Sequence, residues 1–105
     1  MTETLKQRIA GEKGVISYFY SDKCAPCVSL RPKVKQMVEE DFPGMELILV
    51  NSEEHPETTA HFGVFANPSI IVFFEGKEFR RYSKYISINE MGGDINRIYP
   101  LVFDN

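Results

Sequence analysis

The 105-residue sequence contains no tryptophan and only two cysteines. Two cysteines are too few for the disulfide framework with which small secreted domains replace a large core. The sequence also lacks a basic excess, since 12 lysines and arginines stand against 15 acidic residues and give a net charge of −3. Proteins that neutralise phosphate backbones carry the opposite balance, so we expect no nucleic-acid partner.

Long apolar runs are missing as well. No segment approaches the roughly 20 apolar residues of a membrane span, and residues 1–9 are too charged for the apolar part of a secretory signal. We therefore expect a cytoplasmic protein without membrane attachment. Because that compartment is reducing, two cysteines within one tetrapeptide indicate redox chemistry or metal binding rather than a structural disulfide.

The overall composition is typical of a globular chain. Hydrophobic residues make up 43% of the sequence and charged residues 26%, which is too apolar for a disordered chain. A chain of this length encloses one hydrophobic core rather than two. We expect a single domain over residues 1–105, and a monomer.

Hydrophobic periodicity predicts an α/β fold. Apolar residues four apart predict a short first helix, capped by Thr2 or Thr4. A following strand–helix–strand order predicts a parallel pair. A Glu-Gly turn predicts a later antiparallel hairpin whose second strand is an exposed edge, and a Gly-Gly pair weakens the last helix. The expected architecture is a four-stranded mixed β-sheet flanked by helices, with helices at 2–11, 24–40, 57–62 and 86–101 and strands at 15–20, 45–50, 69–74 and 77–84.

The segment Cys24-Ala25-Pro26-Cys27 lies where a predicted buried strand gives way to a helix. Side chains three apart on a helix are neighbours, so the two sulfurs can form a reversible disulfide. The first sulfur lies at the helix N-terminus, where unpaired N–H groups favour a thiolate. We expect Cys24 to be the nucleophile. Cys27, shielded one turn into the helix, would resolve the mixed disulfide formed on Cys24.

Two further motifs extend this pattern. Pro32 lies inside the same helix, five residues after Cys27, and Asn67-Pro68-Ser69 precedes the most apolar strand. Together with the cysteine segment, these motifs resemble the thioredoxin family over nearly the whole chain. The resemblance implies the thioredoxin fold, with Pro68 in a cis-proline loop beside the cysteines.

The resemblance also implies the activity and the binding surface. It implies a thiol-disulfide oxidoreductase that reduces disulfide-containing proteins in cell redox homeostasis, needs no bound cofactor and is recharged by an NADPH-dependent thioredoxin reductase. The backbone of Asn67 would pair with an extended substrate segment, and Lys84 replaces a glycine that lines the family's substrate groove. The implied substrate-binding residues are Ala25, Pro26, Asn67, Pro68 and Lys84.

Several positions depart from the family. Thioredoxins usually carry a tryptophan where this chain has Lys23. Their buried aspartate and its lysine partner correspond here to Tyr18 and Leu49. Because the resemblance implies that this aspartate accepts the proton of the resolving thiol, its absence predicts slower resolution or a substitute base, for which Glu53 is a candidate.

Two residues close to the cysteines have two interpretations each. Lys23 either stabilises the Cys24 thiolate or is a solvated turn residue. Tyr18 is expected to pack in the core first, with a hydroxyl contact to the cysteines as the alternative. Both are therefore candidates for tuning the site.

Other functions remain open. A thioredoxin-like domain could act as a binding or redox-sensing module with little turnover. Gly92-Gly93-Asp94 is similar to a glutathione-contacting motif of glutaredoxins, although it lies inside the last predicted helix. His55 and His61 could join the cysteines around zinc, but their spacing is far longer than that of a zinc finger, and we expect no metal.

Overall fold

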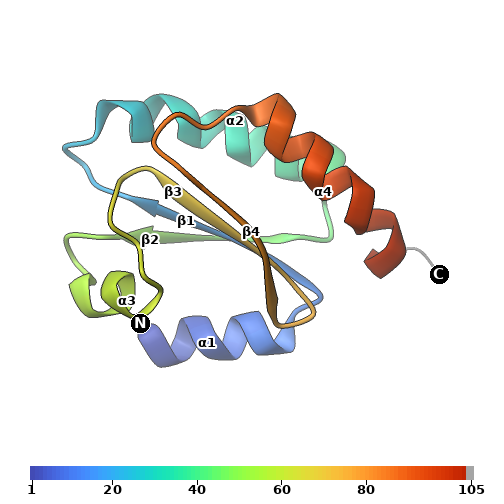
Figure 1. Ribbon diagram of the computed structural model, residues 1–105, viewed down its shortest axis with the longest axis horizontal. Helices are drawn as coiled ribbons and strands as arrows, with labels where there is room; N and C mark the ends of the chain where they lie inside the picture. Colours follow the sequence, from blue (N-terminus) through green and yellow to red (C-terminus); the bar gives the residue numbers. More distant parts are fainter. Residues whose placement is uncertain (104–105) are drawn as a thin grey trace.

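A computed structural model describes residues 1–103, in which helices and strands alternate except for the hairpin β3–β4 (Figure 1). Their order matches the expected one, and their ends lie within about two residues of the expected positions. The elements are α1 (Thr2–Gly11), β1 (Gly14–Tyr20), α2 (Ala25–Asp41), β2 (Glu46–Asn51), α3 (Pro56–His61), β3 (Ser69–Phe74), β4 (Lys77–Ser83) and α4 (Ile88–Phe103).

The strands form one mixed sheet in the order β2-β1-β3-β4. β1 pairs with β2 in parallel and with β3 antiparallel, which confirms the predicted strand–helix–strand unit. β4 pairs only with β3, so it is the exposed edge that the charged sequence predicted. The turn before it has positive φ at both Glu75 (51°) and Gly76 (83°), the geometry that suits a two-residue hairpin.

Helices cover both faces of the sheet (Figure 1). α2 and α4 lie on one face, and α1 and α3 lie on the other. Because successive strand residues point to opposite faces, Ile16 and Tyr18 pack under α2 and α4, whereas Val15 and Phe19 pack in the cluster that includes α1. β1 is therefore buried from both sides, and the segment that follows it is held firmly in place.

The predicted caps of α1 are wrong. Met1 takes the capping position and makes no side-chain bond, whereas the Thr2 hydroxyl lies 2.6 Å from the hydroxyl of Thr58 on α3. A tertiary hydrogen bond between two helices has replaced the local capping bond. The buried Leu5 and Ile9 hold α1 against the sheet as expected.

α4 is continuous, although its sequence predicted a weak point at its centre. It runs without interruption through Gly92 and Gly93, although glycine lowers helix propensity. Met91 and Ile95 are fully buried on the face that meets the sheet and α2, and this packing outweighs the local weakness. No helix within residues 1–103 is long and apolar enough to cross a membrane.

Candidate active site

The two cysteines lie at the start of α2, directly after the C-terminal end of β1 (Figure 1). Cys24 is the capping residue of α2, and a disulfide joins it to Cys27 with their Cα atoms 5.3 Å apart. The Cys27 N–H donates to the Cys24 sulfur at 3.2 Å. Cys24 is partly exposed, whereas Cys27 is completely buried. The outer sulfur is therefore the one that a partner can reach.

The cis-proline loop lies beside this helix start. The Asn67-Pro68 peptide bond is cis, as the resemblance implied, and Pro68 is buried. The Lys84 N–H donates to the Pro68 carbonyl at 3.0 Å, which ties the end of β4 to the loop. A groove of about 180 Å³ runs between the first turn of α2 and this loop. Its lining residues are Pro26, Ser29, Leu30, Lys33, Pro68, Lys84 and Ile86.

Asn67 is anchored through its side chain. The Ser52 hydroxyl donates to its side-chain oxygen at 3.0 Å. Within residues 1–103, its main-chain N–H and C=O make no hydrogen bond with the rest of the chain. Unpaired main-chain groups on a fixed loop are available to pair with an extended polypeptide. Ala25, the other implied binding residue, is exposed at the start of α2.

Tyr18 contacts the backbone of the inner cysteine, Cys27. Its side chain is fully buried, and its hydroxyl donates to the Cys27 carbonyl at 2.7 Å. Burial raises the pKa of the Tyr18 hydroxyl above its ordinary value, and the positive charge of Arg31 lowers it in part. Tyr18 thus remains a protonated hydrogen-bond donor at neutral pH. The hydroxyl contact to a cysteine, the alternative to a packing role alone, is therefore present.

Arg31 lies near both Tyr18 and Tyr20. Its guanidinium carbon lies 4.2 Å from the centre of the Tyr20 ring, a cation–π arrangement. Its Nε atom is buried and has no hydrogen-bond partner within residues 1–103. Arg31 was not identified from the sequence, although its position one turn after Cys27 was a signal that the two are neighbours on α2.

Lys23 and Glu53 pair with each other in front of the cysteines. Their charged atoms lie 3.6 Å apart, and the Glu53 carboxylate also accepts a hydrogen bond from the Ser21 hydroxyl at 2.7 Å. The Ser21 hydrogen bond and the Lys23 charge lower the pKa of Glu53. Glu53 therefore braces the turn before Cys24, and within residues 1–103 its carboxylate makes no hydrogen bond to Cys27.

The residues of the zinc and glutaredoxin hypotheses have other structural roles. His55 caps α3, and the ring of His61 packs edge-on against Phe62 with centroids 4.9 Å apart. No group of three or more His, Cys, Asp or Glu residues in the described part of the chain is arranged to hold a metal ion. Asp94, on α4, accepts a hydrogen bond from the Tyr82 hydroxyl at 2.7 Å.

Two exposed aromatic residues near the binding residues in sequence were not identified from the sequence. Phe65 precedes the cis-proline loop and is 93% exposed, and Tyr85 follows Lys84 and is 99% exposed. Their signal in the sequence was their position, within two residues of Asn67 and Lys84, which were already assigned to the binding surface.

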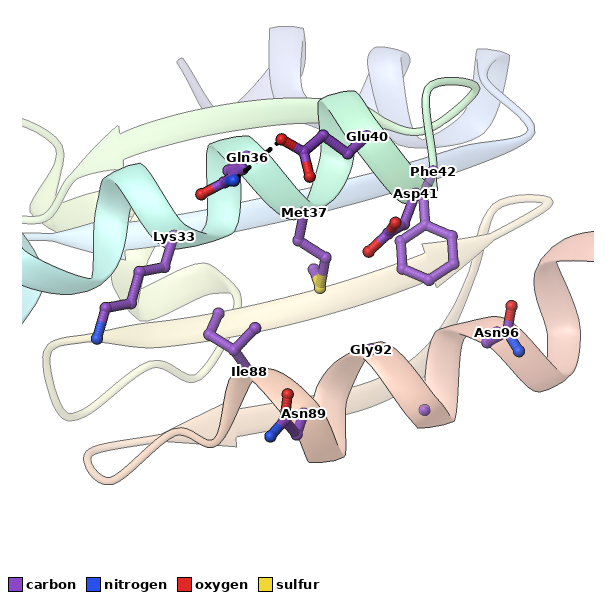
Figure 2. Close-up of a pocket in the computed structure, with 11 residues that line it drawn as sticks. Lys33, Gln36, Met37, Glu40, Asp41, Phe42, Ile88, Asn89, Gly92 and Asn96 are labelled. Atoms are coloured by element: carbon purple, nitrogen blue, oxygen red, sulfur yellow. Dashed lines mark hydrogen bonds between the residues drawn. The ribbon is translucent and has the colours of Figure 1, made fainter.

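A cavity larger than this groove lies elsewhere. It has a volume of about 740 Å³ and runs between α2 and α4 (Figure 2). Met37 and Ile88 face one another across it, and polar residues such as Gln36 and Asn89 line its rim. It shares Lys33 with the groove at the cis-proline loop. The cysteines do not line it.

Comparisons with known proteins agree with this geometry. The model of the Thioredoxin family matches residues 1–96. A thioredoxin from Alicyclobacillus acidocaldarius subsp. acidocaldarius is 30% identical over 80 residues, which is 76% of this chain and 76% of that protein. The thioredoxin-like protein YdfQ of Bacillus subtilis is 26% identical over 87 residues, which is 81% of this chain and 77% of that protein.

Solved structures show the same fold. Thioredoxin f2 from Chlamydomonas reinhardtii superposes with a TM-score of 0.82 at 17% identity, covering 94% of this chain and 93% of that one. Thioredoxin 1 from Thermosipho africanus has a TM-score of 0.76 at 26% identity, covering 83% of this chain and 96% of that one. The four-stranded mixed sheet with helices on both faces is therefore a known architecture.

Proposed function

The chain belongs to the thioredoxin family and is a thiol-disulfide oxidoreductase, and we propose that it reduces protein disulfides with Cys24 as nucleophile and Cys27 as resolving cysteine. The observation that carries the assignment is the asymmetry of the pair. Cys24 is partly exposed at the cap of α2, and Cys27 is completely buried with its N–H directed at the Cys24 sulfur. A thiolate at Cys24 would gain that N–H and the positive end of the helix dipole.

The proposed reaction transfers two electrons from the dithiol to the substrate. The Cys24 thiolate attacks one sulfur of the substrate disulfide, and the other substrate sulfur leaves as a thiolate that takes up a proton. Cys27, once deprotonated, attacks the Cys24 sulfur of this mixed disulfide and releases the second substrate thiol. The chain then carries the Cys24–Cys27 disulfide, the state in which the structure holds it.

We assign the substrate to the groove beside the cis-proline loop. An extended segment around the substrate disulfide would pair with the free main-chain groups of Asn67 and pass over Pro68 toward Lys84. Pro26 would form the opposite wall, with Ala25 exposed next to Cys24. Backbone pairing fixes the direction of the segment without demanding a particular sequence, which suits a reductase of many proteins.

Tyr18 is proposed as a positioning residue for Cys27. Its phenol is not a base at neutral pH, since burial raises its pKa. Instead, its hydrogen bond to the Cys27 carbonyl fixes the first turn of α2, and with it the direction from which the inner sulfur attacks. Lys23 is held in a pair with Glu53, so its charge on the Cys24 thiolate would be partly compensated.

We further propose that an NADPH-dependent thioredoxin reductase regenerates the dithiol and that the protein works as a monomer in the cytoplasm. Family membership supports the reductase as electron donor. Such a donor is needed because the Cys24–Cys27 pair must be reduced after every turnover. A reducing compartment would keep the pair ready for the next substrate. Oxidation of NADPH in the presence of a purified reductase, and the size of the protein in solution, test these assignments.

The test of the function is reduction of insulin with excess small-molecule dithiol. We expect turnover by the wild-type chain and no turnover by Cys24→Ser. In a separate reaction without added dithiol, pre-reduced Cys27→Ser should form a stable mixed disulfide with the substrate. Absence of turnover in the wild-type chain would instead favour a binding or redox-sensing module. Trapping through Cys27 in Cys24→Ser, but not through Cys24, would reverse the two assigned roles.

A further inference from the structure

Two lysines from different elements face the groove beside the cis-proline loop. Lys33 belongs to α2 and Lys84 follows β4, and both line the groove. The remaining lining residues are uncharged. Figure 2 shows the Lys33 side chain extending from α2 on the side where Ile88 begins α4. The whole chain carries a net charge of −3, so the positive charge at this groove is a local feature.

Lys84 has an unusual backbone conformation. Its φ angle is +66°, in the left-handed region that glycine adopts readily and side-chain-bearing residues adopt at a cost. The structural role of this position is the N–H bond to the Pro68 carbonyl, which a glycine would make equally well. A lysine side chain therefore occupies the rim of the binding groove at a conformational cost. Such costs concentrate at functional sites.

Neither lysine is neutralised by a carboxylate. Within residues 1–103, Lys33 and Lys84 take part in no ion pair, whereas Lys23 pairs with Glu53 and Arg81 pairs with Glu78. Two cations from different elements that line one groove create a positive potential where a substrate segment would lie.

We propose that Lys33 and Lys84 form a cationic clamp that selects disulfides flanked by aspartate or glutamate residues. The occupant is an extended acidic segment of a protein substrate, with its carboxylates beside the two ammonium groups and its disulfide at Cys24. This selection rests on the proposed reductase function and adds the substrate class. Because both lysines are exposed, salt screens the interaction, and it acts on substrate capture more than on the chemical step.

The experiment compares two disulfide-bonded peptides of equal length that differ only in carrying glutamate or lysine on both sides of one cysteine. The kcat/KM of each is measured with excess dithiol at low and at high salt. Two exposed charge pairs predict a preference of about 5- to 10-fold for the acidic peptide at low salt. The preference should fall to about 2-fold or less at high salt, with kcat unchanged.

The variants separate charge from fold. In Lys33→Gln/Lys84→Gln the preference should disappear at low salt, and Lys84→Gly should lose part of it while keeping the backbone bond to Pro68. Lys35→Gln is the matched control, because Lys35 also lies on α2 but does not line this groove. Its preference should equal that of the wild type.

The outcomes distinguish this inference from the function on which it rests. Equal reduction of both peptides by the wild type, or an unchanged preference in the double variant, overturns the clamp and leaves the reductase assignment standing. Failure to reduce either peptide, together with failure to reduce insulin, overturns both.

Discussion

The hydroxyl of Tyr18 donates a 2.7 Å hydrogen bond to the main-chain carbonyl of Cys27. This contact joins the buried centre of β1 to the first turn of α2, directly beneath the reactive pair. The phenol of Tyr18 is therefore hydrogen-bonded to the backbone of Cys27, the inner cysteine.

Tyr18→Phe should destabilise the protein. The ring remains, but the buried Cys27 carbonyl loses a hydrogen-bond donor, so we expect the free energy of unfolding to fall by about 1–2 kcal/mol. Urea denaturation of the oxidised protein measures the change. Tyr20→Phe is the matched control: Tyr20 lies two residues later on the same strand, and within residues 1–103 its hydroxyl makes no hydrogen bond. Equal losses in the two variants would contradict the role of the hydroxyl.

Stability should decrease in alkali because of Tyr82. Burial, and then its hydrogen bond to the Asp94 carboxylate, raise the Tyr82 pKa far above the ordinary value of 10.0. The folded protein therefore retains a proton that the unfolded chain loses, so the tyrosine's contribution is complete below pH 10 and is lost as the pH rises above it. Each such tyrosine steepens the loss by up to about 1.4 kcal/mol per pH unit.

Urea denaturation between pH 8 and pH 11 measures this dependence, with Tyr82→Phe beside the wild type. The Tyr82 variant should show a shallower decline above pH 10, and the remaining slope should include Tyr18, whose pKa is also raised. Identical slopes in the two proteins would refute the shift at Tyr82.

Lys84→Gly should stabilise the protein. Glycine adopts the left-handed backbone at this position without strain, and the relief exceeds its extra conformational entropy, so we expect a gain of roughly 0.5–1 kcal/mol. Thermal and urea unfolding measure it. Glu75→Gly is the matched control, since Glu75 has φ of +51° in a turn away from the cysteines. Both variants should gain stability, but only Lys84→Gly should change substrate preference. Loss of stability in both would contradict the strain argument.

Glu53→Gln should leave insulin reduction nearly unchanged. The carboxylate braces Ser21 and Lys23 and makes no hydrogen bond to Cys27 within the described residues. Removal of a true general base lowers the rate by roughly 100-fold or more. Turnover assays across pH 6–9 test this directly. A loss of that size, with normal folding, would make Glu53 the substitute base that the sequence suggested.

The elements of this fold were predictable because their signals are local. Alternation and four-residue spacing of apolar side chains depend on neighbours in sequence, so β1, α2 and β3 appear close to where the pattern places them. The position of Cys24 at a helix start follows from the strand that precedes it. The strength of α4 was underestimated because its stability comes from packing against the sheet and α2 rather than from its own residues.

The sequence by itself therefore determined the fold class, the order of elements and the identity of the reactive pair. Only the tertiary structure decided what surrounds that pair: the Tyr18 bond to Cys27, the pairing of Glu53 with Lys23, and the meeting of Lys33 and Lys84 across one groove. Each of these contacts joins separate parts of the chain. A contact of this kind depends on how helices pack on a sheet and which side chains then face one another, and no local periodicity records that.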